Sequence, residues 1–178
     1  MRQLFGRLTE RSFIERIGWV DATVVKYVAN LLTEFSQTEN LYRIRDTSGR
    51  RLEEVGEMLI EADLLLNAGS LEREREVYRH IGDFTLFMMG VFPEYLRRIK
   101  SSGLIHHPDF LIDYVRVGRR SYHNVSEFGF GEYRDWVPLF KKLAGNFELC
   151  VMGLGFVRSD LERMREQSFT RAQEILLN

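Results

Sequence analysis

The sequence predicts an all-α protein, a single-domain bundle of about six helices that spans residues 1–178. Three observations support this fold class. The chain has only 3 prolines in 178 residues, so long stretches are free of helix breakers. Apolar side chains recur at the 3.6-residue spacing of an amphipathic helix. The alternation typical of a strand is confined to residues 41–45, where we do not predict a strand.

The N-terminal half accounts for two helices and a shorter segment before them. Residues 21–36 carry an apolar stripe that ends at Phe35, and Asp21 is a good N-cap. A second helix follows the turn at residues 46–49, begins near Leu52 and stops at residues 67–69. Residues 1–18 mix apolar side chains with arginines. We expect them to dock on the core as a short helix, and an arm that forms a homodimer is the alternative.

A helix over residues 70–90 is predicted to lie at the centre of the fold. Ser70 is its expected N-cap, and glutamates in its first turns suit the positive end of the helix dipole. From Ile81 to Val91 apolar residues lie on nearly every side, as is typical of a helix surrounded by others.

The C-terminal half is predicted to supply the remaining helices. One spans residues 109–126 and opens at Pro108 and Asp109, with Gly118 in mid-face leaving room for a neighbour. Two more cover residues 133–143 and the stretch from 146 onward, where Gly153 and Gly155 allow close packing or a kink. We expect residues 160–178 to form a C-terminal helix that docks on the core or binds a partner.

Composition excludes several classes of function. With 25 basic and 26 acidic residues, the chain has no overall field for nucleic acid or an anionic membrane. A lone cysteine, Cys150, lies in an apolar run and has no disulfide partner within the chain. No apolar run approaches the roughly 20 residues of a membrane span, and the first residues do not resemble a signal peptide. We therefore expect a cytoplasmic protein without nucleic-acid or membrane partners.

Asp83 is the main candidate for a functional residue. Phe87 follows it one turn later and the rest of the helix carries no charge, and a buried carboxylate is costly unless it is paired or protonated. The helix at 109–126 offers partners, which predicts a polar ligand pocket between it and the helix at 70–90. The candidate ligand-binding residues are Asp83, Tyr114, Arg119, Ser121 and Tyr122.

A metal-dependent enzyme is the alternative hypothesis. Glu76, His80 and Asp83 are spaced i, i+4, i+7 and share one helix face, and His123 is a fourth candidate ligand. The spacing matches neither the Glu-x-x-His pair of di-iron bundles nor the His-Glu-x-x-His motif of zinc proteases. The sequence therefore favours binding over catalysis and predicts no cofactor.

Two segments carry a resemblance to a known family. Residues 82–94 read GDFTLFMMGVFPE, and residues 114–122 read YVRVGRRSY. Together they resemble a bacterial family of all-helical proteins of unknown function, with the pattern GDxxLFxxGxFPE followed by YxxxGRxxY. The resemblance implies no activity, cofactor or substrate. It implies that Glu76 and His80 lie outside the family's pattern, whose members here are Asp83, Gly90, Phe92, Pro93, Tyr114, Gly118, Arg119 and Tyr122.

The sequence thus leaves ligand and reaction unknown. Its leading interpretation is a cytoplasmic helical binding or protein-interaction module, with a small molecule or a protein as partner.

Overall fold

The all-α fold class is confirmed. The computed structural model describes residues 1–68, 70–101, 109 and 112–164. Within these ranges it contains nine α-helices and no strand, apart from one isolated bridge between Arg45 and Arg51. The number exceeds the predicted six partly because two short helices without a long periodic stripe, α3 (Thr38–Leu41) and α6 (Pro93–Ser101), were not predicted.

The N-terminal segment docks on the rest of the chain. Helix α1 (Arg2–Glu10) continues into a π-helical segment (Arg11–Ile17) that ends at Gly18 in the left-handed conformation. Helix α2 (Ala22–Phe35) begins as predicted, since the Asp21 carboxylate accepts hydrogen bonds from the Thr23 and Val24 amides. Helix α1 packs against α2 and α9, so the apolar side of residues 1–18 is covered within the chain.

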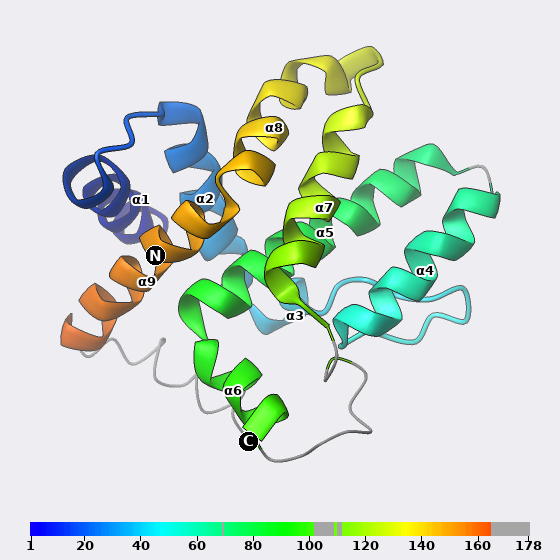
Figure 1. The fold of residues 1–178 in the computed structure, drawn as a ribbon, viewed down its shortest axis with the longest axis horizontal. Helices are drawn as coiled ribbons and strands as arrows, with labels where there is room; N and C mark the ends of the chain where they lie inside the picture. Colours follow the sequence, from blue (N-terminus) through cyan, green and yellow to red (C-terminus); the bar gives the residue numbers. More distant parts are fainter. Residues whose placement is uncertain (69, 102–108, 110–111, 165–178) are drawn as a thin grey trace.

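Helix α5 (Leu71–Val91) lies in the middle of the fold, as predicted. In Figure 1 it runs between α2 on one side and α4 (Val55–Ala68) on the other. It contacts α7, α9, α4, α6 and α2, and its second half is buried almost throughout. Ser70 is the N-cap residue, as predicted, although its side chain makes no capping hydrogen bond. The short helix α3 (Thr38–Leu41) follows α2.

The boundary predicted at residue 109 is wrong. After α6 (Pro93–Ser101), helix α7 spans Tyr114–Glu127 with Asp113 as its N-cap. Asp113 caps it by accepting a hydrogen bond from the Arg116 amide, so the helix begins five residues later than the predicted start at residue 109. Gly118 does allow close approach, because a methyl group there would overlap the Phe147 ring and the Thr85 hydroxyl.

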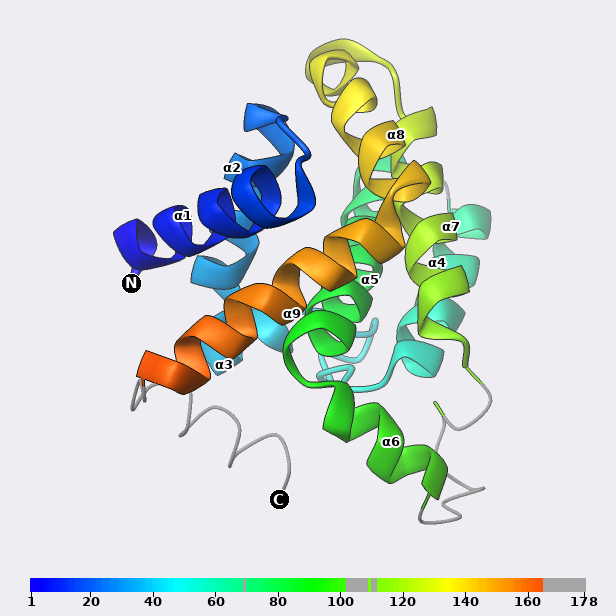
Figure 2. The ribbon, with the colours of Figure 1, turned by 60° about the vertical axis from the view of Figure 1, so that its left-hand side comes forward.

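The C-terminal elements close the fold over α5. A 3-10 segment (Gly131–Trp136) leads into α8 (Val137–Gly145), and α9 (Phe147–Met164) crosses in front of α5 in Figure 2. Gly153 permits close packing of the Phe13 ring, and the Ser12 hydroxyl donates to the Gly153 carbonyl at 2.6 Å. Helix α9 runs through residue 160, where a separate helix was predicted. The rest of that predicted helix, residues 165–178, lies outside the described residues.

In the described part of the chain, no helix is both long and apolar enough to cross a membrane. Cys150 is buried as a free thiol, and burial raises its pKa to about 12. It is therefore protonated and unreactive at neutral pH.

Candidate functional site

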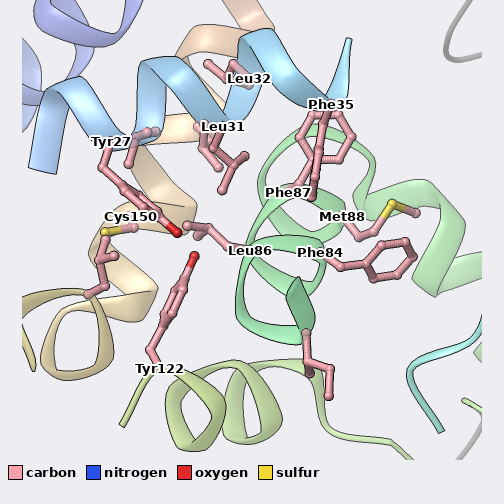
Figure 3. Close-up of a cluster of buried hydrophobic side chains, with 14 of the residues drawn as sticks. Tyr27, Leu31, Leu32, Phe35, Phe84, Leu86, Phe87, Met88, Tyr122 and Cys150 are labelled. Atoms are coloured by element: carbon pink, nitrogen blue, oxygen red, sulfur yellow. The ribbon is translucent and has the colours of Figure 1, made fainter. Parts of the chain in front are cut away.

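Asp83 is buried at the junction of three helices, with 2% of its surface exposed. Its Oδ1 accepts hydrogen bonds from the Tyr27 hydroxyl of α2 at 2.7 Å and the Tyr122 hydroxyl of α7 at 2.8 Å. Figure 3 shows the two rings reaching from opposite helices toward each other across the core. One carboxyl oxygen thus joins α2, α5 and α7.

Arg79 lies one turn before Asp83 on α5 and faces the same junction. Its Nε lies 3.6 Å from Asp83 Oδ2 and donates to the Tyr27 hydroxyl at 3.2 Å. The guanidinium carbon also lies 5.7 Å from the centre of the Tyr27 ring. A cation therefore stands beside the buried carboxyl, with Tyr27 bonded to both.

Burial dominates the protonation behaviour of this cluster. It raises the pKa of the Asp83 carboxyl, although Arg79 and both tyrosine hydroxyls oppose the shift by stabilising the charged form. Burial and the neighbouring carboxylate raise the pKa of Tyr27 and of Tyr122 far above the ordinary value for a phenol. Both tyrosines are therefore protonated donors, and neither is suited to act as a base near pH 7.

A pocket of about 300 Å³ opens above this cluster, between α2, α5 and the start of α8. Asp83, Arg79 and Tyr27 lie at its inner end. The exposed side chains Thr23, Lys26 and Trp136 lie at its rim. The remaining lining residues are Asn30, Leu31, Glu34 and Leu139.

The predicted location, between the helices at 70–90 and 109–126, holds a different pocket. That space of about 330 Å³ lies among α4, α5 and α7 and is lined by Ser121 and Tyr78 but not by Asp83. Tyr122 is fully buried and joins Asp83 from the side of α7. The pocket next to Asp83 opens instead on the side of α2.

The structure brings together only some of the predicted ligand-binding residues. Asp83 and Tyr122 are in contact, whereas Ser121 lies in the other pocket and Arg119 is exposed. Tyr114 donates to Asp109 Oδ2 at 2.5 Å, away from Asp83. Asp109 can accept this hydrogen bond because α7 begins only at Tyr114, so that Asp109 lies in the segment before the helix.

The predicted metal ligands do not converge. Glu76 is exposed and pairs with Arg73 at 2.8 Å, and His123 is exposed on α7. His80 is fully buried, with Nε2 3.1 Å from the Leu41 carbonyl oxygen. Burial and nearby arginines lower the His80 pKa to about 3, so the ring is neutral. Among the described residues, no group of three or more histidine, cysteine, aspartate or glutamate side chains is placed to hold a metal.

Sequence reasoning missed Tyr27 and Arg79, although both left a signal. Tyr27 falls on the apolar stripe of α2, three residues after Val24 and four before Leu31. Arg79 stands four residues before Asp83, the spacing of an ion pair within a helix. The two side chains meet, however, only because α2 crosses α5 at this point. No local sequence pattern predicts that crossing.

Comparisons with known proteins add no relative from which this site could be interpreted. No known protein family, curated protein or solved structure matches the chain, and the family resemblance of residues 82–94 and 114–122 stays a prediction.

Proposed function

We propose that this protein is a cytoplasmic binding module that takes a small polar molecule in the pocket between α2, α5 and α8. One observation carries the proposal: a buried carboxyl, Asp83, and a partly exposed arginine, Arg79, meet at the inner end of a pocket that opens to solvent. The cytoplasmic location rests on the unpaired, buried thiol of Cys150.

The chemistry of the pocket supports a binding role. Ligand sites combine apolar walls with a few polar groups that fix orientation. Here Leu31 and Leu139 supply apolar wall, while Arg79 and Asn30 supply hydrogen-bonding groups. A volume of about 300 Å³ lies at the lower end of the range for small-molecule sites, which favours a fragment-sized ligand.

The hydrogen-bond network fixes these groups before a ligand arrives. Tyr27 is bonded to both Asp83 and Arg79, and Tyr122 bonds Asp83 from behind. A preorganised site loses less conformational entropy on binding than a mobile one. The same network holds the protons on both tyrosines, so it supports binding rather than acid–base catalysis.

A fragment screen on the full chain, followed by protein NMR, tests the proposal. We expect polar fragments to shift the amide signals of Asn30 and Glu34 and the indole signal of Trp136. Thr23→Trp fills the pocket from its exposed rim and should abolish these shifts. Lys141→Trp places the same side chain on an exposed part of α8 outside the pocket and should preserve them.

Fragments that shift only signals outside this pocket, or that bind Thr23→Trp as well as the wild type, would overturn the proposal. So would a screen in which no fragment shifts any pocket signal.

A further inference from the structure

The two terminal nitrogens of the Arg79 guanidinium group indicate what kind of ligand the pocket accepts. Its Nε is engaged by Tyr27 and lies near Asp83. In the described part of the chain, its two terminal nitrogens have no hydrogen-bond partner, and the side chain, 32% exposed, lines the pocket. The terminal N–H groups of a guanidinium form a planar fork that matches a carboxylate or a phosphate.

The rim adds a second cation. Lys26 is exposed beside the pocket and forms no ion pair within the described residues. Glu34 is the one rim carboxylate among the described lining residues, and it lies 3.8 Å from Arg43. Arg43 therefore partly compensates the charge of Glu34, which also acts on Arg79, whereas Lys26 has no ion-pair partner among the described residues.

A second arginine strengthens the positive field behind the pocket. Arg75, one turn before Arg79, is buried with its Nε unbonded and stacks on the Tyr133 ring at 4.0 Å. No carboxylate of the described chain lies within ion-pair distance of it. Burial and the charge of Arg79 lower the Arg75 pKa. Arg75 and Arg79 therefore repel each other, and an anion at Arg79 would reduce this repulsion.

The opposite wall suits an apolar group. Trp136 is 46% exposed at the rim, an unusual state for a large aromatic side chain, and Leu31 and Leu139 lie deeper. The 3-10 segment that carries Trp136 is fixed to α5 through the contact between Tyr133 and Arg75. Trp136 is therefore held beside the pocket, where a ring could stack on it.

On the basis of the proposed function, we infer that the ligand is a small oxyanion with a ring or other apolar group. Its carboxylate or phosphate lies against the terminal nitrogens of Arg79 and within reach of Lys26, and its apolar part lies against Trp136. The carboxylate and the phosphate share this recognition chemistry, and the experiment separates them.

Four probes with the same ring and different charge test the inference: phenyl phosphate, phenylacetate, benzyl alcohol and benzylamine. Each is titrated into the full chain at low salt, with the Trp136 indole signal and the amides of Asn30 and Glu34 as readout. We expect the two anions to bind at least about tenfold more tightly than the alcohol, as the loss of a charged hydrogen bond implies. The tighter of the two anions identifies the oxyanion.

Variants locate the anion within the pocket. Arg79→Lys keeps the charge but removes the fork, and it should weaken anion binding about tenfold while leaving benzyl alcohol unaffected. Lys26→Gln should weaken it less, because Lys26 is exposed. Arg7→Gln removes an exposed arginine of α1 and should change nothing. Thermal unfolding of each variant confirms that it is folded.

The outcomes separate the inference from the proposed function. If benzyl alcohol or benzylamine binds in the pocket as tightly as the anions, the inference is overturned and the pocket remains a binding site. If Arg79→Lys binds the anions as well as the wild type, the position assigned to the anion is wrong. If none of the four probes shifts a pocket signal, the inference is overturned, whereas the proposed function is overturned only if the wider fragment screen also finds no fragment that shifts a pocket signal.

Discussion

Asp83 is a carboxyl group in the most apolar part of α5, and two tyrosines make its burial tolerable. Tyr27 and Tyr122 both donate to Oδ1, and Arg79 stands near Oδ2. The dependence is mutual, because Tyr122 is fully buried and Asp83 is its hydrogen-bond acceptor. A buried donor left without an acceptor costs about 1–3 kcal/mol.

We therefore expect Asp83→Leu to lower the free energy of unfolding by about 2–4 kcal/mol. The substitution leaves the Tyr122 hydroxyl without a hydrogen-bond acceptor and Arg79 without its neighbouring carboxyl group. Adding Tyr122→Phe should recover part of the lost stability, because the buried hydroxyl donor without an acceptor is then absent. Urea denaturation of the wild type, both single variants and the double variant gives a coupling energy of about 1 kcal/mol or more. Strict additivity of the two substitutions would contradict the network.

Two glycines of the helical core differ in what surrounds them. A methyl group at Gly118 would overlap the Phe147 ring, which is buried, and the Thr85 hydroxyl. At Gly155 on α9, no atom lies within 4 Å of the same methyl position. Both residues lie inside helices, where alanine is otherwise preferred by roughly 1 kcal/mol.

Gly118→Ala should therefore destabilise the protein by about 1–3 kcal/mol through overpacking. Gly155→Ala should instead stabilise it, by up to about 1 kcal/mol. Chemical denaturation followed by circular dichroism measures both. Equal effects of the two substitutions would show that α5, α7 and α9 do not approach as closely as the structure places them.

At the scale of elements, helix α4 begins at a cap supplied by a distant residue. The Asp109 carboxylate accepts hydrogen bonds from the Val55 amide at 3.0 Å and the Gly56 amide at 2.7 Å. Glu54 lies directly before this helix start and hydrogen-bonds Tyr95. Burial and the negative charge of Asp109 raise the pKa of Glu54 to about 7.

This pKa predicts how stability depends on pH. Below its unfolded value, 4.5, Glu54 is protonated in both states and its contribution is complete. As the pH rises from 4.5 to about 7, the unfolded chain releases the proton first, so the free energy of unfolding falls.

Glu54→Gln is neutral at every pH and should escape this loss. Because the side chain is partly exposed, we expect the variant to be more stable than the wild type by about 1–2 kcal/mol at pH 8 and equal to it at pH 4. Glu53→Gln removes an exposed neighbouring charge and serves as the control. Parallel pH profiles for the wild type and Glu54→Gln would show that Glu54 has an ordinary pKa.

Helices with a long apolar stripe on one face could be predicted from the sequence. The first residue of a helix that follows an irregular segment could not. The stripe and cap of α2 located that helix to within a residue, and the apolar second half of α5 identified the central element. The start of α7 was misplaced because Pro108 and Asp109 look like a helix start. Asp109 does cap a helix, but the helix is α4, and only the tertiary fold brings the two together.

At the scale of the whole molecule, the sequence could predict only those parts of the site that lie within one helix or between α5 and α7, the two helices between which the sequence predicts a pocket. Burial of Asp83 followed from its local neighbours, and Tyr122 was a named partner. Tyr27 and the pocket itself arise from the crossing of α2 over α5, between segments far apart in the sequence. A pocket does lie at the predicted place between α5 and α7, but Asp83 does not line it, and the pocket that Asp83 lines faces α2.

The packing of the N-terminal segment against α9 predicts cooperative unfolding. The π-helical segment contacts α9 through the Ser12 hydrogen bond to Gly153 and the Arg16 ion pair with Asp160 at 2.8 Å. The buried apolar side chains from α1 to α9 form one continuous cluster. A single core without an internal boundary favours an all-or-none transition.

The two tryptophans test this directly, because they report on different regions. Trp19 follows the N-terminal segment and contacts Phe13, whereas Trp136 lies at the start of α8. In Trp136→Phe only Trp19 fluoresces, and in Trp19→Phe only Trp136 does. Within each variant, the fluorescence and far-ultraviolet circular dichroism midpoints in urea should coincide. If Trp19 reports an earlier transition than circular dichroism, α1 and the π-helical segment unfold separately, and their contacts with α9 do not couple them to the core.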